Sequence, residues 1–132
     1  MNVLSGKITA IEVQGNLSMV SIAVGKLKLK SIVIETPASA SYLINDGNIQ
    51  VLFKETEVIL ANADMSSTSI INSIPCQVNA IERGQLLSKV ELLHLEQKIT
   101  AIITTEALDY LQVKAGAEIN ALIKTNELML AK

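Results

Sequence analysis

The chain repeats itself once, and this duplication limits the folds it can adopt more than any other feature of its sequence. VLFKETEVILA (residues 51–61) returns 70 residues later as ALIKTNELMLA (residues 121–131), and KITAIE (7–12) returns as QVNAIE (77–82). Matches at this offset run from end to end of the 132 residues, with small gaps in the loops. The chain therefore consists of two similar units, and we expect both to adopt the same fold.

The repeat divides the chain into a first unit (1–61), a linker (62–71) and a second unit (72–132). The joint, NADMSSTSII, is rich in Ser, Thr and Asn, a composition typical of linkers. A unit of about 60 residues buries only about 60% of the surface that its unfolded chain exposes, so it is marginally stable alone. We therefore expect the units to pack on each other, on other chains, or on both.

The spacing of apolar residues and turn residues predicts five short strands and one helix in each unit. In the first unit the strands are expected at 6–13, 17–24, 26–35, 48–54 and 57–61, the last two forming a closing hairpin. A helix is expected at 36–44, and its counterpart near 105–112. Thr36 would cap the first helix, with Pro37 at its first helical position.

This order of elements, with the helix between the third and fourth strands, is that of an OB-type small barrel. The predicted fold class is mostly β, with two tandem OB-type five-stranded small barrels, each with one short helix. Hydrophobic residues make up 49% of the chain and charged residues 18%, which indicates a globular protein.

Composition also argues against several classes of function. Three aromatic residues and a net charge of −2 are unfavourable for an OB-type nucleic-acid binder, which stacks bases on aromatics in a basic groove. The single cysteine, Cys76, excludes an internal disulfide and a multi-cysteine metal cage within one chain. No apolar run approaches the roughly 18 residues of a membrane span, and the N-terminus lacks a basic-then-apolar leader. We therefore expect an intracellular protein that binds neither membrane nor nucleic acid.

Catalytic patterns are lacking as well. The carboxylates show no acid/base spacing, and His94 is a lone histidine in a polar hairpin without partners for a metal. We expect no enzyme activity. The lysines at 26, 28 and 30 share one face of a strand, which reads either as a solvated face or as an anion-attracting rim.

Two longer segments resemble the molbindin (Mop or TOBE) family. ITAIITTEALDYLQVKAGAEINALIKTNELMLA (99–131) is similar to the C-terminal half of that domain, with an I-T step, a short helix, a Gly, an L-I-K strand and a closing strand. TSIINSIPCQVNAIERG (68–84) is similar to the opening motif, Ser-Ala-Arg-Asn followed by Leu-x-Gly and a strand. The same order occurs in both units, so the resemblance covers the whole chain twice.

The resemblance to di-domain molbindins, and to the oxyanion-sensing region of molybdate-responsive regulators, implies a function. It implies binding of molybdate or tungstate in the cytoplasm, by homotrimers of two-unit chains with sites at subunit interfaces. Such a protein would store, buffer or otherwise maintain molybdenum.

Candidate site residues follow from the motif positions. In the second unit Ser69 and Asn72 stand at the family's Ser and Asn, while Ile70 and Ile71 replace its Ala and Arg. Thr104 stands at the Thr of the I-T step.

The strand lysine occurs in both units, as Lys54 and Lys124. In the first unit Asn2 keeps the motif's Asn, but Ile34 replaces the Thr, so the second unit retains more of the set. We therefore expect the better site in the second unit.

A tetrahedral dianion needs several converging donors and at least one cation, and hydroxyl, amide and ammonium groups are suitable. Ile70 and Ile71 would contribute backbone N–H groups only. Each polar candidate also has a purely structural interpretation: the lysines could face solvent or protect a strand edge, Thr104 could cap a helix, and Ser69 could belong to a linker. Asn2 and Asn72 could position the first strands. If these interpretations hold, the chain would be an oligomerisation module with decayed anion sites.

Overall fold

The computed structural model describes residues 1–65 and 67–132; Ser66, within the expected linker, lies outside the described residues. The first repeat contributes β1 (Asn2–Gln14), β2 (Leu17–Val24), β3 (Leu27–Val33), β4 (Asn48–Phe53), the 3-10 helix η1 (Glu55–Glu57) and β5 (Ile59–Asn62). The second contributes β6 (Asn72–Glu82), β7 (Leu87–His94), β8 (Gln97–Thr104), the helix α1 (Thr105–Leu111), β9 (Glu118–Ile123) and β10 (Met129–Ala131).

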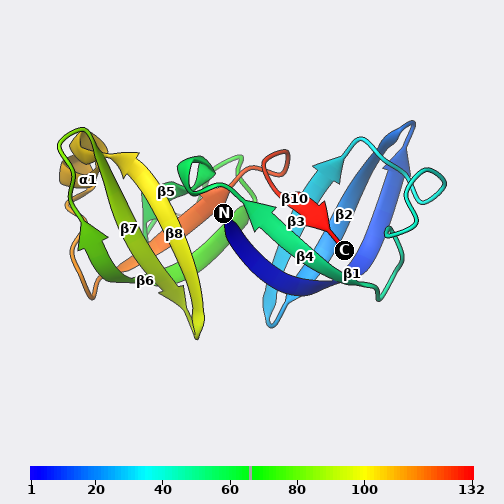
Figure 1. Ribbon diagram of the computed structural model, residues 1–132, viewed down its shortest axis with the longest axis horizontal. Helices are drawn as coiled ribbons and strands as arrows, with labels where there is room; N and C mark the ends of the chain where they lie inside the picture. The colour runs from blue at the N-terminus through cyan, green and yellow to red at the C-terminus, as the bar shows by residue number, and fades with distance from the viewer. Residues whose placement is uncertain (66) are drawn as a thin grey trace.

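These strands form two five-stranded antiparallel sheets that lie side by side (Figure 1). The first barrel is the sheet β10-β4-β1-β2-β3, and the second barrel is the sheet β5-β9-β6-β7-β8 together with α1. The predicted fold class is confirmed as mostly β, in two OB-type five-stranded units. Among the described residues, the helices lack the length and hydrophobicity that a membrane-spanning helix requires.

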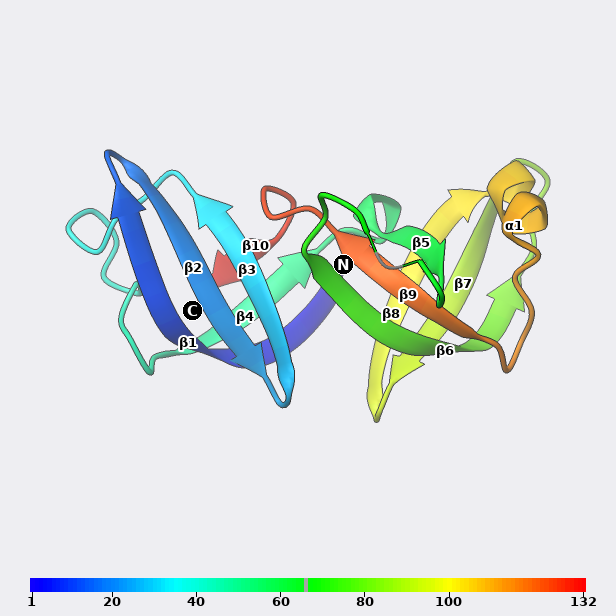
Figure 2. The same ribbon diagram turned by 180° about the vertical axis from the view of Figure 1, so that it is seen from behind.

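The two barrels exchange their closing strands, so the expected hairpin between the fourth and fifth strands is wrong. β5 of the first repeat pairs with β9, with Leu60 opposite Ala121, and β10 of the second repeat pairs with β4, with Leu130 opposite Val51. Figure 1 shows β10 and the C-terminus within the first barrel, and Figure 2 shows β5 beside β9. After β4, η1 carries the chain across to the other sheet.

Because the two closing strands have similar sequences, either sheet can accept either strand without losing its backbone pairing. The expected units 1–61 and 72–132 describe the sequence repeat, and as domain boundaries they stay a prediction. Each barrel, however, takes one strand from the other repeat.

Alternating burial along the strands builds the core. In β1 the side chains of Leu4 and Ile8 point inward, and Phe53 at the end of β4 is fully buried. The exchanged segment closes the first barrel, since Ser31 Oγ in β3 donates a hydrogen bond of 2.7 Å to the carbonyl oxygen of Leu128. The two barrels share one continuous cluster of buried apolar side chains.

The prediction of a helix at 36–44 is wrong, because this segment forms only turns. The backbone N–H groups of Ser39 and Ala40 donate to the Thr36 carbonyl, and the Leu43 N–H donates to the Ala40 carbonyl, so the segment forms separate turns and no continuous helix. Ser39 Oγ hydrogen-bonds the Thr36 N–H and C=O, an alternative partner that competes with helix continuation. In the second repeat the residues of α1 include Ala107 and Leu108, which favour helix formation.

Candidate functional site

The seam between the barrels is built around two asparagines at equivalent positions. Asn72, at the start of β6, donates from Nδ2 to the Lys30 carbonyl (2.8 Å) and accepts at Oδ1 from the Lys30 N–H (2.7 Å). Asn2, at the start of β1, makes the same pair of bonds with Thr100, both at 2.8 Å. Each amide therefore acts like one more backbone unit, joining the strand of one barrel to the edge of the other.

Both asparagines are buried, with 6% of Asn2 and 1% of Asn72 exposed. Their carbonyl oxygens and one of their two N–H donors are engaged with the neighbouring strand. The structure thus gives Asn2 and Asn72 the positioning role considered above, and leaves each amide with one N–H beyond these bonds.

The two lysines end strands rather than lying inside them. Lys124 directly follows β9 and Lys54 directly follows β4, and each carbonyl accepts a hydrogen bond of 3.0 Å, from Glu127 and Glu57 respectively. Both side chains are exposed. Within the described residues, no ion pair includes either lysine, so both ammonium groups are available to an anion.

Register places each lysine beside the opening segment of its own repeat. Asn72 lies opposite Ile123, so Lys124 lies beside the end of the Ser69–Ile71 segment. Asn2 lies opposite Phe53, so Lys54 adjoins Met1. The Met1 amino group forms an ion pair of 2.5 Å with Glu55, which follows Lys54.

In the Ser69–Ile71 segment, one backbone N–H group already has a hydrogen-bond partner, and two of the three residues are exposed. Ser69 is exposed, and 58% of Ile71 is exposed. Thr68 Oγ1 accepts from the Ile70 N–H at 3.0 Å, so that N–H already has a partner. A small hollow of about 260 Å³ adjoins the segment, with Ile70, Ile71 and Ser73 among its lining residues.

Thr104 is not brought to this group within one chain. Its Oγ1 accepts from the Ala107 N–H at 3.0 Å and caps α1, the structural role considered for it above. α1 lies at the end of the second barrel that is remote from the seam (Figure 1). Thr100, which bonds Asn2 at the seam, is four residues earlier on β8, a separation of roughly 13 Å. Sequence reasoning therefore joined Thr104 and Lys124 in one set, whereas a single chain holds them apart.

The exchange of strands also crosses the two repeats at the seam. η1, directly after Lys54, packs against β8 of the second repeat. In the other direction, the Ile32 N–H of β3 donates to the carbonyl of Thr125, directly after Lys124, at 3.1 Å. Each lysine therefore stands where the two repeats meet.

One ion pair outside the seam, between Arg83 and Asp109, is structural. Arg83 forms two hydrogen bonds with the Asp109 carboxylate, of 2.6 and 2.8 Å, tying the end of β6 to α1. The Arg83 guanidinium holds the pKa of Asp109 below its usual range. Burial raises the pKa of the Cys76 thiol to about 11, so it packs as a neutral group. No cluster of three or more His, Cys, Asp or Glu that could hold a metal occurs in the described part of the chain.

Comparison with protein families matches a TOBE domain to residues 68–130. This chain carries a TOBE domain. The match includes α1, Lys124 and the Ser69–Asn72 segment, and the first repeat has the same strand order as the TOBE repeat. The resemblance to molbindin (TOBE) domains predicted above is thereby confirmed.

The fold as a whole is similar to a solved structure. A crystal structure of the cytoplasmic molybdate-binding protein ModG, in a form with molybdate bound, superposes with a TM-score of 0.89 and 27% sequence identity. The alignment covers 98% of this chain and 94% of that chain, so it includes the TOBE repeat and the first repeat together. A sequence comparison with curated proteins found no match.

Proposed function

We propose that this protein binds molybdate or tungstate in the cytoplasm and serves in molybdenum storage, buffering or homeostasis. The observation that carries the proposal is the structural similarity to ModG along 98% of the chain, in a form of that protein with molybdate bound. Lys54 and Lys124 support it, because each repeat keeps one exposed cation at the same place beside the seam. A binding role requires no catalytic step, and we propose none.

The oxyanion would be held mainly by hydrogen bonds to a charged partner. Candidate donors are the Lys124 ammonium group, the Ser69 hydroxyl, the remaining Asn72 N–H and the backbone N–H of Ile71. The equivalent set in the first repeat is Lys54 and Asn2. Ile70 contributes less, because its N–H already bonds Thr68.

We further propose that the sites are completed between chains, in a homotrimer of two-unit chains. Thr104 and Lys124 both match the motif but lie apart in one chain, so a second copy would be needed to bring them together. Exposed apolar side chains support assembly: 77% of Ile34, 81% of Leu86 and 85% of Tyr110 are accessible in the single chain. Such exposure commonly marks interaction surfaces.

Titration calorimetry with molybdate, tungstate and sulfate tests binding. We expect saturable heats for molybdate or tungstate, and a Lys124→Ala variant that binds about 10- to 100-fold more weakly, as for loss of one charge-assisted hydrogen bond. Lys54→Ala should have a smaller effect, and Lys114→Ala, which removes an exposed lysine between α1 and β9, should have none. Absence of heat for both metal oxyanions at high micromolar concentration would contradict the proposal.

Light scattering with and without molybdate tests assembly. A trimer mass that persists or increases with molybdate is expected. A protein that stays monomeric while it is saturated with molybdate would instead place the whole site within one chain.

A second candidate is an oligomerisation module whose anion sites have decayed. It is favoured by the engagement of the Asn2 and Asn72 amides with neighbouring strands and by the apolar residues at 70 and 71. The two functions differ in one measurement: the module would form the trimer but would give no heat with either oxyanion.

A further inference from the structure

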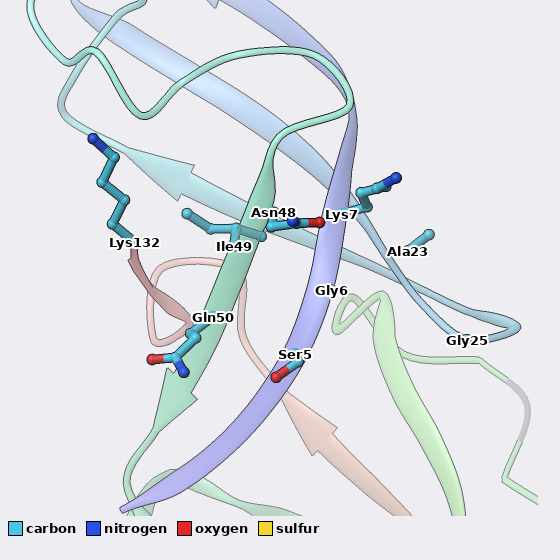
Figure 3. Close-up of a pocket in the computed structure, with 9 residues that line it drawn as sticks. All are labelled: Ser5, Gly6, Lys7, Ala23, Gly25, Asn48, Ile49, Gln50 and Lys132. Carbon is cyan, nitrogen blue, oxygen red and sulfur yellow. The ribbon is translucent and has the colours of Figure 1, made fainter.

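The outer face of the first barrel carries lysines on both sides of one small residue. On β2, Ala23 lies directly opposite Lys7 of β1 and also directly opposite Lys28 of β3. Directly opposite residues have Cβ atoms about 4.5–5.5 Å apart and point to the same face, so the two lysines flank Ala23 with roughly 10 Å between their Cβ atoms. Figure 3 shows the Lys7 and Ala23 side chains extending to the same side of the sheet.

The next row of the same face continues the pattern. Ser21 lies opposite Ala10 of β1 and opposite Lys30 of β3. The floor of the face therefore consists of Ala10, Ser21 and Ala23, all with short side chains, while lysines stand at its sides. This leaves space above β2 that long side chains can enclose.

Two adjoining hollows occupy this space. One, of about 450 Å³, is lined by residues of this floor, by Lys28 and Lys30, and by Ile71 and Asn72 of the seam. The other, of about 600 Å³, contains Lys7 and Gly25 in its lining (Figure 3). Ala23 lines both, so the two hollows border the same residue, which lies between Lys7 and Lys28. Both volumes lie within the range of about 300–1,000 Å³ that is typical of small-molecule sites.

On the equivalent face of the second barrel, larger and oppositely charged side chains replace two of the short residues of this floor. There Gln77 replaces Lys7, Leu93 replaces Ala23 and Glu91 replaces Ser21. Glu91 forms an ion pair of 3.2 Å with Lys98, the counterpart of Lys28. The second barrel thus fills the floor with a leucine and neutralises its lysine with a carboxylate.

The first barrel lacks this neutralisation. In the described residues, no carboxylate lies within ion-pair distance of Lys7, Lys28 or Lys30. Like charges gathered on one face repel each other, and a bound anion would remove that repulsion. Ile71, of which 58% is exposed, adds an apolar side chain to the lining, which an inorganic anion would leave without a partner.

We propose that this face is a second anion site, and that it takes a phosphate monoester of a small organic molecule. The phosphate lies over Ala23 between the ammonium groups of Lys7 and Lys28, and the organic part lies in the 450 Å³ hollow between Lys30 and Ile71. Flexible lysine stems allow both ammonium groups to approach one phosphate. Its lysines differ from Lys54 and Lys124, although Ile71 and Asn72 border both this hollow and the proposed oxyanion site.

Calorimetry with adenosine monophosphate, adenosine and inorganic phosphate tests the proposal on the full chain. Adenosine monophosphate should bind at millimolar concentration or below, inorganic phosphate about tenfold more weakly, and adenosine not measurably. Lys7→Gln and Lys28→Gln should each weaken binding of the monophosphate by about tenfold or more. Lys98→Gln, the matched change in the second barrel, should leave it unchanged.

Two further variants carry residues of the second barrel into the first. Ser21→Glu should abolish binding by pairing with Lys28, as Glu91 pairs with Lys98, and Ala23→Leu should abolish it by filling the floor. Molybdate titrations of Lys28→Gln should match those of the parent, which separates this site from the proposed oxyanion site. No saturable heat with the monophosphate, or equal affinity in the parent, Lys28→Gln and Ser21→Glu, would overturn the proposal.

Discussion

The two barrels share a strand order, a core pattern and a seam. They differ in two places: only the second barrel carries the helix α1, and the outer face of β1–β3 differs from the equivalent face of β6–β8. The second barrel has a capped helix and an outer face whose charges are paired: Glu91 accepts hydrogen bonds from Asn79 and contacts Lys98, which hold the pKa of its carboxyl below the usual range. The first barrel has turns at 36–44, and its Lys7, Lys28 and Lys30 form no ion pair with any carboxylate in the part of the chain that the structure describes. The comparison teaches that the core and the seam impose the duplicated plan, while the outer faces are free to diverge.

The barrels are nevertheless not independent, because each borrows its closing strand. A substitution in β5 of the first repeat should therefore destabilise the second barrel, and a substitution in β10 of the second repeat should destabilise the first barrel. This is the sharpest way to test the comparison, and it gives the largest expected effect.

Leu60 belongs to the first repeat but lies in β5 of the second barrel, where only 7% of it is exposed. Leu60→Ala should lower the free energy of unfolding by about 2–5 kcal/mol, the range for buried leucines. Amide hydrogen exchange should accelerate first in β9 and β6, not in β4 and β1. Leu130→Ala, the matched change in β10, should act on β4, and more weakly because Leu130 is only half-buried. Faster exchange in the barrel of the mutated repeat would contradict the exchange of strands.

The seam predicts the next largest effect. Asn72→Ala removes the partner of the Lys30 N–H and C=O, and Asn2→Ala does the same at Thr100. Loss of a partner for a buried backbone group costs about 1–3 kcal/mol, and each variant should lose an amount in this range. Denaturant unfolding measures the loss. A much larger effect at one asparagine than at the other would break the symmetry of the seam.

The helix gives a smaller effect. Thr104→Ala removes the cap of α1 and should cost about 1 kcal/mol, with reduced helical signal in circular dichroism. The reciprocal change Ile34→Thr should not stabilise the first barrel. Pro37 stands where Ala107 donates its N–H to the cap, and proline has no N–H to donate. Stabilisation by Ile34→Thr would show that the first barrel can form the helix after all.

The smallest expected effect concerns Tyr42, a half-buried residue in the turns at 36–44 of the first repeat. Desolvation, together with its hydrogen bond to Glu35, raises the pKa of Tyr42 from 10.0 to about 12. Since the folded state favours the neutral phenol, this contribution to stability is complete below pH 10 and is lost as pH rises towards 12. Absorbance titration should show a late tyrosinate component that Tyr42→Phe removes. A parent protein without that component would rule out the partly buried Tyr42–Glu35 contact.

Much of the fold could be read from the residues because local patterns determine it. The offset of 70, the alternation in strands such as LSMVSIAV, and the position of α1 all follow from side-chain period and turn residues. The helix expected at 36–44 failed for a local reason as well: Thr36 was read as a cap, but the Ser39 hydroxyl bonds the N–H and C=O of Thr36, which competes with helix continuation. The repeat also drew attention to two residue pairs, because a lysine (Lys54 and Lys124) and an asparagine (Asn2 and Asn72) occur at equivalent positions in both units.

What the amino-acid sequence by itself determined is therefore the duplicated barrel and the residue types available at each position, since these depend on near neighbours along the chain. Only the tertiary structure decided which sheet receives each closing strand, because two nearly identical strands fit either edge. It also decided that Asn2 and Asn72 bridge the barrels, that Thr104 lies apart from Lys124, and that Lys7 and Lys28 flank Ala23. These are relations across strands, and register in three dimensions sets them.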